Sequence, residues 1–151
     1  MKIYASSDHA GFALRRTLVD ALRARDVDVE DLGPGQPTSC DYPAEAQAVA
    51  LRMIADPGSR GLLVCGSGIG MCIAANRFPG VRAVDAWSVE AARLSRAHND
   101  ANVLCIGARM VSEVDARAIL EIWLATAFDG ERHARRVAAI DRAPSSMPPR
   151  E

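Results

Sequence analysis

Short apolar runs alternate along this chain with longer amphipathic segments, and this alternation restricts the possible folds more than any other feature. Five of the short runs are rich in β-branched residues or bounded by turn signals, and they predict strands at residues 2–6, 27–32, 61–65, 81–86 and 102–107. Most of them are uninterrupted apolar stretches, a pattern typical of a parallel sheet with helices on both faces. The sequence therefore predicts a three-layer α/β fold with a five-stranded parallel sheet.

The amphipathic segments between these runs predict helices. Leu14, Leu18 and Leu22 share one face of the first helix, which leaves Arg15 and Arg16 for solvent. Further helices are expected at about 43–55, from the glycine-rich loop to 77, at 89–97, at 113–127 after a Ser112 cap, and at 131–142. The last helix has only a thin apolar stripe, so we expect it to dock on a partner. Residues 143–151 are expected to be a disordered tail, which leaves one domain at 1–142.

Composition argues against several functional classes. The chain has 151 residues, of which 49% are apolar and 25% charged, and its formal net charge is -1, so neither a disordered chain nor a nucleic-acid-binding surface is indicated. The N-terminus becomes polar by Ser6, and no apolar run approaches the ~20 residues that span a bilayer, so we expect a cytoplasmic protein without a membrane partner. Lys2 is the only lysine, which disfavours Schiff-base, pyridoxal-phosphate and P-loop chemistry.

The stretch CGSGIG follows the third predicted strand and fits none of the common glycine-loop templates. A dinucleotide fingerprint needs a third glycine, and a C-x5-R phosphatase loop needs an arginine, at the position of Met71. Glycines let backbone N–H groups approach a ligand, and a helix that starts in the loop favours an oxyanion there. The same field lowers the pKa of a thiol, which makes Cys65 a candidate thiolate. From this motif alone, a purely structural interpretation is also available, in which the glycines form a tight turn and Cys65 fills the core.

Other polar residues fall at the ends of the predicted elements, where functional side chains are often displayed. They are Asp8 and His9 after the first strand, His98 and Asn99 at the end of the fourth helix, Arg109 after the fifth strand, and Arg132 and Arg136 one helical turn apart. Each of these groups also has a structural interpretation, as a helix cap, a helix C-terminus or a solvated face. Taken together with a thiolate and an oxyanion cradle, they favour a cofactor-free proton-transfer enzyme for phosphorylated small molecules, such as an aldose–ketose isomerase.

Five motifs in collinear order carry a resemblance to a known family. SSDHAGFALR, DYP, VCGSGIGMCIAANRFPGVRA, LSRAHNDANVLCIGARM and ERHARRV closely resemble the type B ribose-5-phosphate isomerases, a family that also holds the galactose-6-phosphate isomerase subunits. The resemblance extends over about residues 1–141. It implies a Rossmann-like fold, no metal or nucleotide cofactor, and a homodimer, which can pair into a tetramer, with active sites built from both subunits.

The resemblance also implies a role for each matched residue. Cys65 is similar to the base that moves a proton between C1 and C2, and the glutamate that replaces it in some members would stand at Met71. Ser67 would shuttle protons between O1 and O2, and His98 would open the sugar ring. The implied substrate contacts are Asp8, Tyr42 and Asn99 to the sugar, the backbone of Gly66, Ser67, Gly68, Ile69 and Gly70 to the enediolate, and His9 and Arg109 of one subunit with Arg132, His133 and Arg136 of the other to the phosphate.

The reaction expected from this resemblance is the interconversion of D-ribose 5-phosphate and D-ribulose 5-phosphate. A tetrose 4-phosphate, allose 6-phosphate or galactose 6-phosphate is the alternative substrate. A non-catalytic sugar-phosphate-binding module would not need Cys65, Ser67 and His98 together. No role beyond packing is expected for Cys72 and Cys105, and Trp87 and Trp123 are expected in the core.

Overall fold

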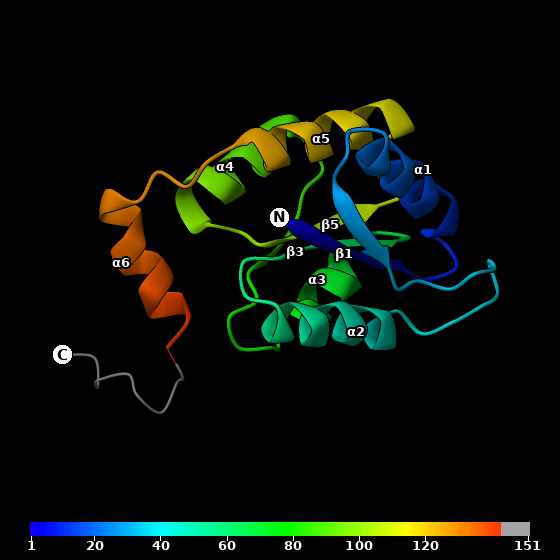
Figure 1. Cartoon of the computed structure of the whole chain (residues 1–151), viewed down its shortest axis with the longest axis horizontal. Helices are drawn as coiled ribbons and strands as arrows, with labels where there is room; N and C mark the ends of the chain where they lie inside the picture. Colours follow the sequence, from blue (N-terminus) through cyan, green and yellow to red (C-terminus); the bar gives the residue numbers. More distant parts are fainter. Residues whose placement is uncertain (143–151) are drawn as a thin grey trace.

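The computed structural model describes residues 1–142 as a parallel sheet covered by helices on both faces (Figure 1). All five strands are parallel and lie in the order β2-β1-β3-β5-β4. Their bounds are Lys2–Ser7 for β1, Asp28–Asp31 for β2, Arg60–Cys65 for β3, Ala83–Asp85 for β4 and Val103–Gly107 for β5. The predicted three-layer α/β fold with a five-stranded parallel sheet is confirmed. The tail predicted at 143–151 lies outside the described residues.

Six helices connect and follow the strands. They are α1 at Phe12–Arg23, α2 at Tyr42–Ala55, α3 at Ile69–Ala75, α4 at Val89–Asn99, α5 at Glu113–Ala125 and α6 at Glu131–Ile140. The predicted Ser112 cap is confirmed, since its hydroxyl accepts the N–H of Asp115 at 3.1 Å. α3 ends before the predicted residue 77, where the side-chain amide of Asn76 donates to the C=O and accepts the N–H of Ala83 on β4. α5 ends two residues early because Thr126 is extended.

The core lies on both faces of the sheet. Along β3, Leu62 and Val64 pack among α1, α4 and α5, whereas Leu63 and Cys65 pack against α2 and α3. Successive side chains of a strand point to opposite faces, so an uninterrupted apolar run fills both layers. Figure 1 shows the two helix layers, with α1, α4 and α5 on one side of the sheet and α2 and α3 on the other.

Three expectations about individual side chains can be compared with the fold. Trp123 is fully buried and Cys105 lies in the core, as predicted, but the prediction for Trp87 was wrong because its side chain is 68% exposed beyond the end of β4. The prediction for Arg15 was also wrong. Its side chain is 2% exposed, because its guanidinium binds the Ser7 hydroxyl at 3.0 Å and the carboxylate of Asp31 at 3.1 Å. A buried charge is tolerated when it is paired in this way.

The last helix lies apart from the two layers. α6 projects beyond the end of α4 (Figure 1), and the backbone N–H of Asp129 in the preceding loop donates to the carbonyl of Ala97 on α4 at 2.9 Å. His133 and Val137 are the buried residues of α6, while Ile140 is exposed. The thin apolar stripe predicted for this helix is therefore only partly buried within one chain. Within residues 1–142, no helix combines the length and the apolar character needed to cross a membrane.

Candidate functional site

The sheet has a switch point between β1 and β3. The chain leaves β1 toward β2 on one side and passes from β3 toward the strands on the other side, and ligands of open parallel sheets bind at such a point. Ser7 pairs with Val64, so the loops after the two strands start side by side. The N–H of Asp8 then donates to the carbonyl of Val64 at 3.2 Å, which holds the two loops together. The predicted crevice therefore begins with Asp8 and Cys65 at one edge of the sheet.

Cys65 and the glycine loop form the centre of this edge. The N–H of Gly68 donates to Sγ of Cys65 at 3.1 Å, and the thiol is 3% exposed. Gly68 has φ +82°, and a Cβ at this residue would lie 2.1 Å from Oδ1 of Asp85, so no other residue fits its backbone or its surroundings. Through this turn the loop folds back over the cysteine, with its backbone close to the sulfur.

Two predicted substrate contacts border the same loop. A Cβ at Gly66 would lie 3.2 Å from the Arg109 guanidinium, and a Cβ at Gly70 would lie 2.7 Å from the ring of Tyr42. The N–H of Arg109 also donates to the carbonyl of Gly66 at 3.0 Å, which ties the loop after β5 to the glycine loop. Because glycines stand at both places, a guanidinium and a phenol can approach the loop backbone directly.

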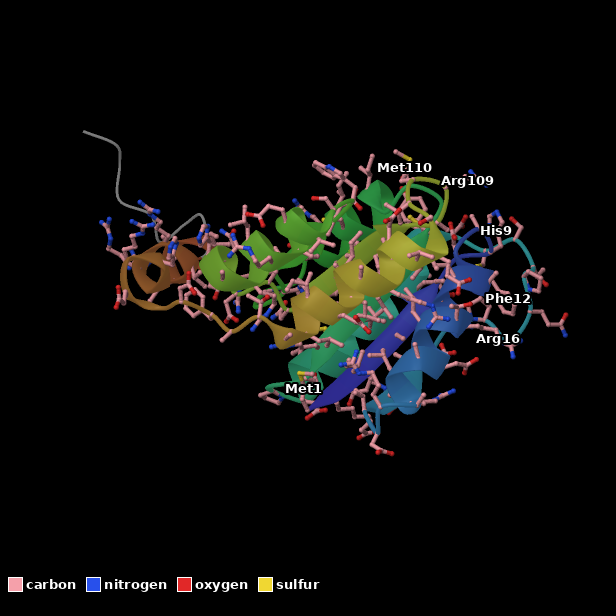
Figure 2. All side chains as sticks on the ribbon, turned by 90° about the horizontal axis from the view of Figure 1, so that it is seen from above. Met1, His9, Phe12, Arg16, Arg109 and Met110 are labelled. Atoms are coloured by element: carbon pink, nitrogen blue, oxygen red, sulfur yellow. The ribbon has the colours of Figure 1, made fainter. Side chains whose placement is uncertain are left out.

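Asp8 and His9 approach the site from the loop after β1. Asp8 is buried, and its Oδ1 accepts the N–H of Gly11 at 2.9 Å. This bond closes the turn before α1, whose N-cap is Gly11 without a side-chain cap, so Asp8 does not cap the first turn of the helix. His9 is exposed, and its Nδ1 accepts the N–H of Cys40 at 3.5 Å. Figure 2 shows His9 and Arg109 at the same end of the molecule. The His9 imidazole and the Arg109 guanidinium, from the loops after β1 and β5, therefore lie at the end of the molecule that carries the glycine loop.

His98 and Asn99 lie at the opposite edge of the sheet. α4 ends at Asn99 just before β5, and the first residue of β5 pairs with Gly61 near the start of β3, whereas Cys65 ends β3. The four strand steps from Gly61 to Cys65 alone span about 13 Å. Within one chain the structure therefore does not bring His98 and Asn99 together with Cys65.

The predicted phosphate-binding residues of α6 lie with His98 and not with the glycine loop. Arg132 and Arg136 are exposed on α6, and Figure 2 shows α6 at the end of the molecule away from His9 and Arg109. His133 is 8% exposed, and its ring stacks on that of His98 with centroids 4.3 Å apart and planes 6° apart. The structure thus divides the predicted residues into two groups at opposite ends of one chain.

Asp129 completes the group around His98, and it could not be predicted from the sequence because it lies in a loop without a motif. Its Oδ2 is 4.0 Å from Nε2 of His98. His98, Asp129 and His133 are the residues within 1–142 whose potential ligand atoms could gather on one metal ion. A metal ion bound by two imidazoles lies near the plane of both rings at about 2.0 Å from each nitrogen, which two parallel stacked rings do not permit. As arranged, this group does not fit a metal.

Asp85 is a second residue that the sequence did not place in the site. It ends β4 at the same edge as Cys65, and its carboxylate lies against Gly68. Burial raises the pKa of Asp85 above its usual value. Its position at the end of an edge strand was the only signal in the sequence, because the packing of its carboxylate on the loop depends on the strand order.

Comparison with known proteins agrees with these features. A family model described as Ribose/Galactose Isomerase matches residues 3–140. Ribose-5-phosphate isomerase B of Escherichia coli strain K12 is 43% identical over 139 residues, which cover 92% of this chain and 93% of that protein. These matches extend over both groups of candidate residues.

Solved structures are similar over the same length. The ribose-5-phosphate isomerase B of Mycoplasma genitalium with bound ribulose-5-phosphate has a TM-score of 0.92 and 36% identity, and the match covers 97% of each chain. The ribose 5-phosphate isomerase of Thermotoga maritima has a TM-score of 0.90 and 41% identity, covering 93% of this chain and 97% of that one. The protein therefore belongs to the ribose/galactose isomerase family, and its relatives place it among the aldose–ketose isomerases of ribose-5-phosphate isomerase type B.

Proposed function

We propose that this protein interconverts D-ribose 5-phosphate and D-ribulose 5-phosphate through an enediolate, with Cys65 as the base. The observation that carries the proposal is the hydrogen bond from the Gly68 N–H to the Cys65 sulfur at 3.1 Å, which places the sulfur at the mouth of the glycine loop beside its backbone donors. The names of the relatives and the ribulose-5-phosphate bound to one of them support the substrate.

In the proposed reaction Cys65 removes the proton from C2 of the open-chain aldose. The electron pair moves to form the C1–C2 double bond of the enediolate, and backbone N–H groups of residues 66–70 stabilise its oxygens. Ser67, which is half-buried in the loop, moves a proton between O2 and O1. The Cys65 thiol then returns its proton to C1, which gives the ketose and restores the thiolate. No step requires a metal or a nucleotide.

The second group of residues requires a second copy of the chain. His98, Asn99, Arg132 and Arg136 are too far from Cys65 to act on one sugar within a single chain, so we propose a homodimer in which α4 and α6 of one copy complete the site of the other. The phosphate would then lie between His9 and Arg109 of one subunit and the two α6 arginines of its partner.

An exposed apolar surface around the glycine loop supports this dimer. Ile69 and Ile73 on α3, Trp87 and Val89 after β4, and Met110 after β5 are all exposed at or near the edge that carries Cys65. Figure 2 labels Met110 next to Arg109. Exposed apolar side chains that gather on one part of a protein surface often mark the place where another protein binds.

We also propose that the enzyme works in the cytoplasm without nucleic-acid or membrane partners.

The experiment that tests this function compares phosphates of four-, five- and six-carbon aldoses side by side in deuterium oxide. We expect conversion to be fastest with ribose 5-phosphate and solvent deuterium to appear at C1 of the ribulose 5-phosphate formed. A preference for a tetrose or hexose phosphate would reassign the substrate within the family. Binding without conversion and without deuterium would instead indicate a sugar-phosphate-binding module.

A further inference from the structure

The stacked pair of His98 and His133 joins two helices through their side chains. His98 lies in the last turn of α4 and His133 in the first turn of α6, and the Asp129 N–H to Ala97 bond fixes the loop between them. The rings are 4.3 Å apart and nearly parallel. This contact holds the ring of His98 in one plane, although the side chain of His98 is itself 39% exposed.

Two stacked imidazoles at this separation do not carry two protons together near neutral pH. Both rings would be cations with their centres 4.3 Å apart, and the repulsion between like charges couples their titrations, so the first proton to bind opposes the second. The pair therefore holds at most one proton in this range, and the surrounding groups decide which ring takes it up.

Several groups favour a neutral His133. Its ring is buried, and Nε of Arg132 donates to its Nε2 at 3.4 Å, a bond that requires this nitrogen to be unprotonated. Burial, followed by the charges of His98, Arg132 and Arg136, lowers the pKa of His133. Both arginines lie on α6, so the positive charge of this helix acts on the buried ring.

Carboxylates lie on the side of His98, the more exposed ring of the pair. Its Nε2 lies 4.0 Å from the Asp129 carboxylate in the loop before α6, and Glu90 on α4 also interacts with its charge. Arg93 on α4 pairs with Glu90 at 2.8 Å and also interacts with the charge of Asp129. The Asp129 carboxylate acts on both rings, but at His133 burial and the arginines of α6 outweigh it, whereas His98 is the more exposed ring beside it.

We infer that His133 is a positioning residue whose buried neutral ring, fixed by Arg132 and stacked on His98, leaves the proton of the pair on His98, so that His98 meets the furanose as a proton donor. This inference rests on the proposed isomerase function. In ring opening the C1–O4 bond breaks, its electron pair goes to O4, and O4 takes the proton of the His98 imidazolium. The hydroxyl on C1 loses its proton to solvent water and becomes the aldehyde.

The first test is a histidine NMR titration of the full-length protein, which needs no substrate. The chain has three histidines, so ¹⁵N signals can be assigned with single variants. Between about pH 5 and pH 8 we expect His133 to stay neutral with its proton on Nδ1, so that any proton taken up by the pair lies on His98. Protonation of His133 before His98, or a proton on Nε2 of neutral His133, would overturn the inference without affecting the proposed isomerase activity.

The second test uses the direction of the reaction. Ribulose 5-phosphate is an open chain, because its C5 oxygen carries the phosphate and no ring can close on C2, whereas ribose 5-phosphate must first open. We expect His133→Ala to lower turnover of ribose 5-phosphate by about tenfold and turnover of ribulose 5-phosphate by less than about twofold. His133→Phe, which keeps a flat stacked ring, should restore most of the loss.

Arg135→Ala on the same helix is the matched control, since Arg135 is exposed and has no assigned contact to the pair. It should leave both directions unchanged. Equal losses in the two directions for His133→Ala would indicate a purely structural role for His133 and would overturn the inference. If His133→Ala does not fold, the NMR titration of the wild-type protein still tests whether His133 stays neutral.

Discussion

The side chain of Cys65 packs with Met71 and Cys105 on the α2–α3 face of the sheet, and its sulfur also accepts the Gly68 N–H at 3.1 Å. The apolar surroundings hold the sulfur in place, and the loop directs a backbone N–H at it. Met71 is buried in the same cluster, so the position at which some relatives are expected to carry a glutamate base holds an apolar core side chain. At the scale of single residues, the Cys65 sulfur therefore both fills the core and forms the proposed reactive group.

Replacing Cys65 by alanine should abolish isomerisation and spare the fold, because only the base is lost. We expect turnover to fall by about a thousandfold. Turnover with ribose 5-phosphate and the thermal unfolding midpoint are the two measurements. Cys105→Ala is the control, because it removes a buried thiol from the same cluster and should cost about 1 kcal/mol of stability with activity largely retained. Near-normal turnover of Cys65→Ala would exclude this cysteine as the base.

Gly68→Ala should impair both stability and activity. Its φ of +82° and the 2.1 Å approach of Asp85 to a Cβ would force the loop to move away from the Cys65 sulfur. We expect a loss of about 2 kcal/mol in the free energy of unfolding, together with a large loss of turnover.

Gly80→Ala separates the two causes. Gly80 also has a positive φ, +77°, but a Cβ there would have open space around it. This variant should lose about 1 kcal/mol and keep its activity. Equal effects of the two variants in denaturant unfolding and in the isomerase assay would show that contact with Asp85 has no separate importance.

At the scale of elements, α6 is the least embedded helix. Only His133 and Val137 of this helix are buried, and an ion pair between Arg82 and Asp141 at 2.9 Å adds to its attachment just beyond its last turn. Its exposed arginines would be of little use to a sugar held by the glycine loop of the same chain. The arginines of α6 could therefore contact a sugar phosphate at a glycine loop only if that loop belongs to another subunit.

Arg136→Ala should weaken binding of the phosphorylated substrate more than it slows the chemistry. A guanidinium forms charge-assisted hydrogen bonds to phosphate, so we expect the Michaelis constant for ribose 5-phosphate to rise by about tenfold while turnover changes less. Steady-state kinetics measure both quantities. Arg135→Ala, one residue away on the exposed side of α6, should leave both unchanged. An unchanged Michaelis constant for Arg136→Ala would contradict a phosphate contact from this helix.

At the scale of the whole molecule, the two groups of candidate residues are separated by the length of the sheet. In a twofold dimer each interface is used twice, so the edge with Cys65 of one copy can meet α4 and α6 of the other and complete two equivalent sites. The exposed side chains of Ile69, Trp87 and Met110 would then be covered by the partner. In the proposed dimer, association of two copies would therefore be a condition for activity.

Hybrid dimers test this arrangement. A heterodimer of one Cys65→Ala chain and one His98→Ala chain, purified through two different affinity tags, should carry one intact and one doubly altered site. We expect about half of the wild-type activity for this hybrid, compared with very little for either mutant homodimer. If each site were built from one chain, both sites of the hybrid would be damaged, and its activity would not exceed that of the homodimers.

The sequence by itself determined the order and type of the elements and most of the chemistry. Short apolar runs and the 3.6-residue period of helices are local features, so the five strands and six helices could be predicted to within a few residues. Cys65 and the glycines around it could be predicted as a site because consecutive residues form that loop. Arg109 and Asp8 could be added because the carboxyl ends of parallel strands lie at one edge of the sheet.

Only the tertiary structure decided which of these residues meet. The ends of α4 and α6 depend on helix direction and loop path, so the sequence did not indicate that His98 stacks on His133 and lies at the far edge from Cys65. Burial of Arg15 and exposure of Trp87 likewise depend on neighbours that are distant in the chain. Periodicity reports which face of an element is apolar, whereas the partner of each polar group is set by strand order and packing, which bring together residues far apart in the sequence.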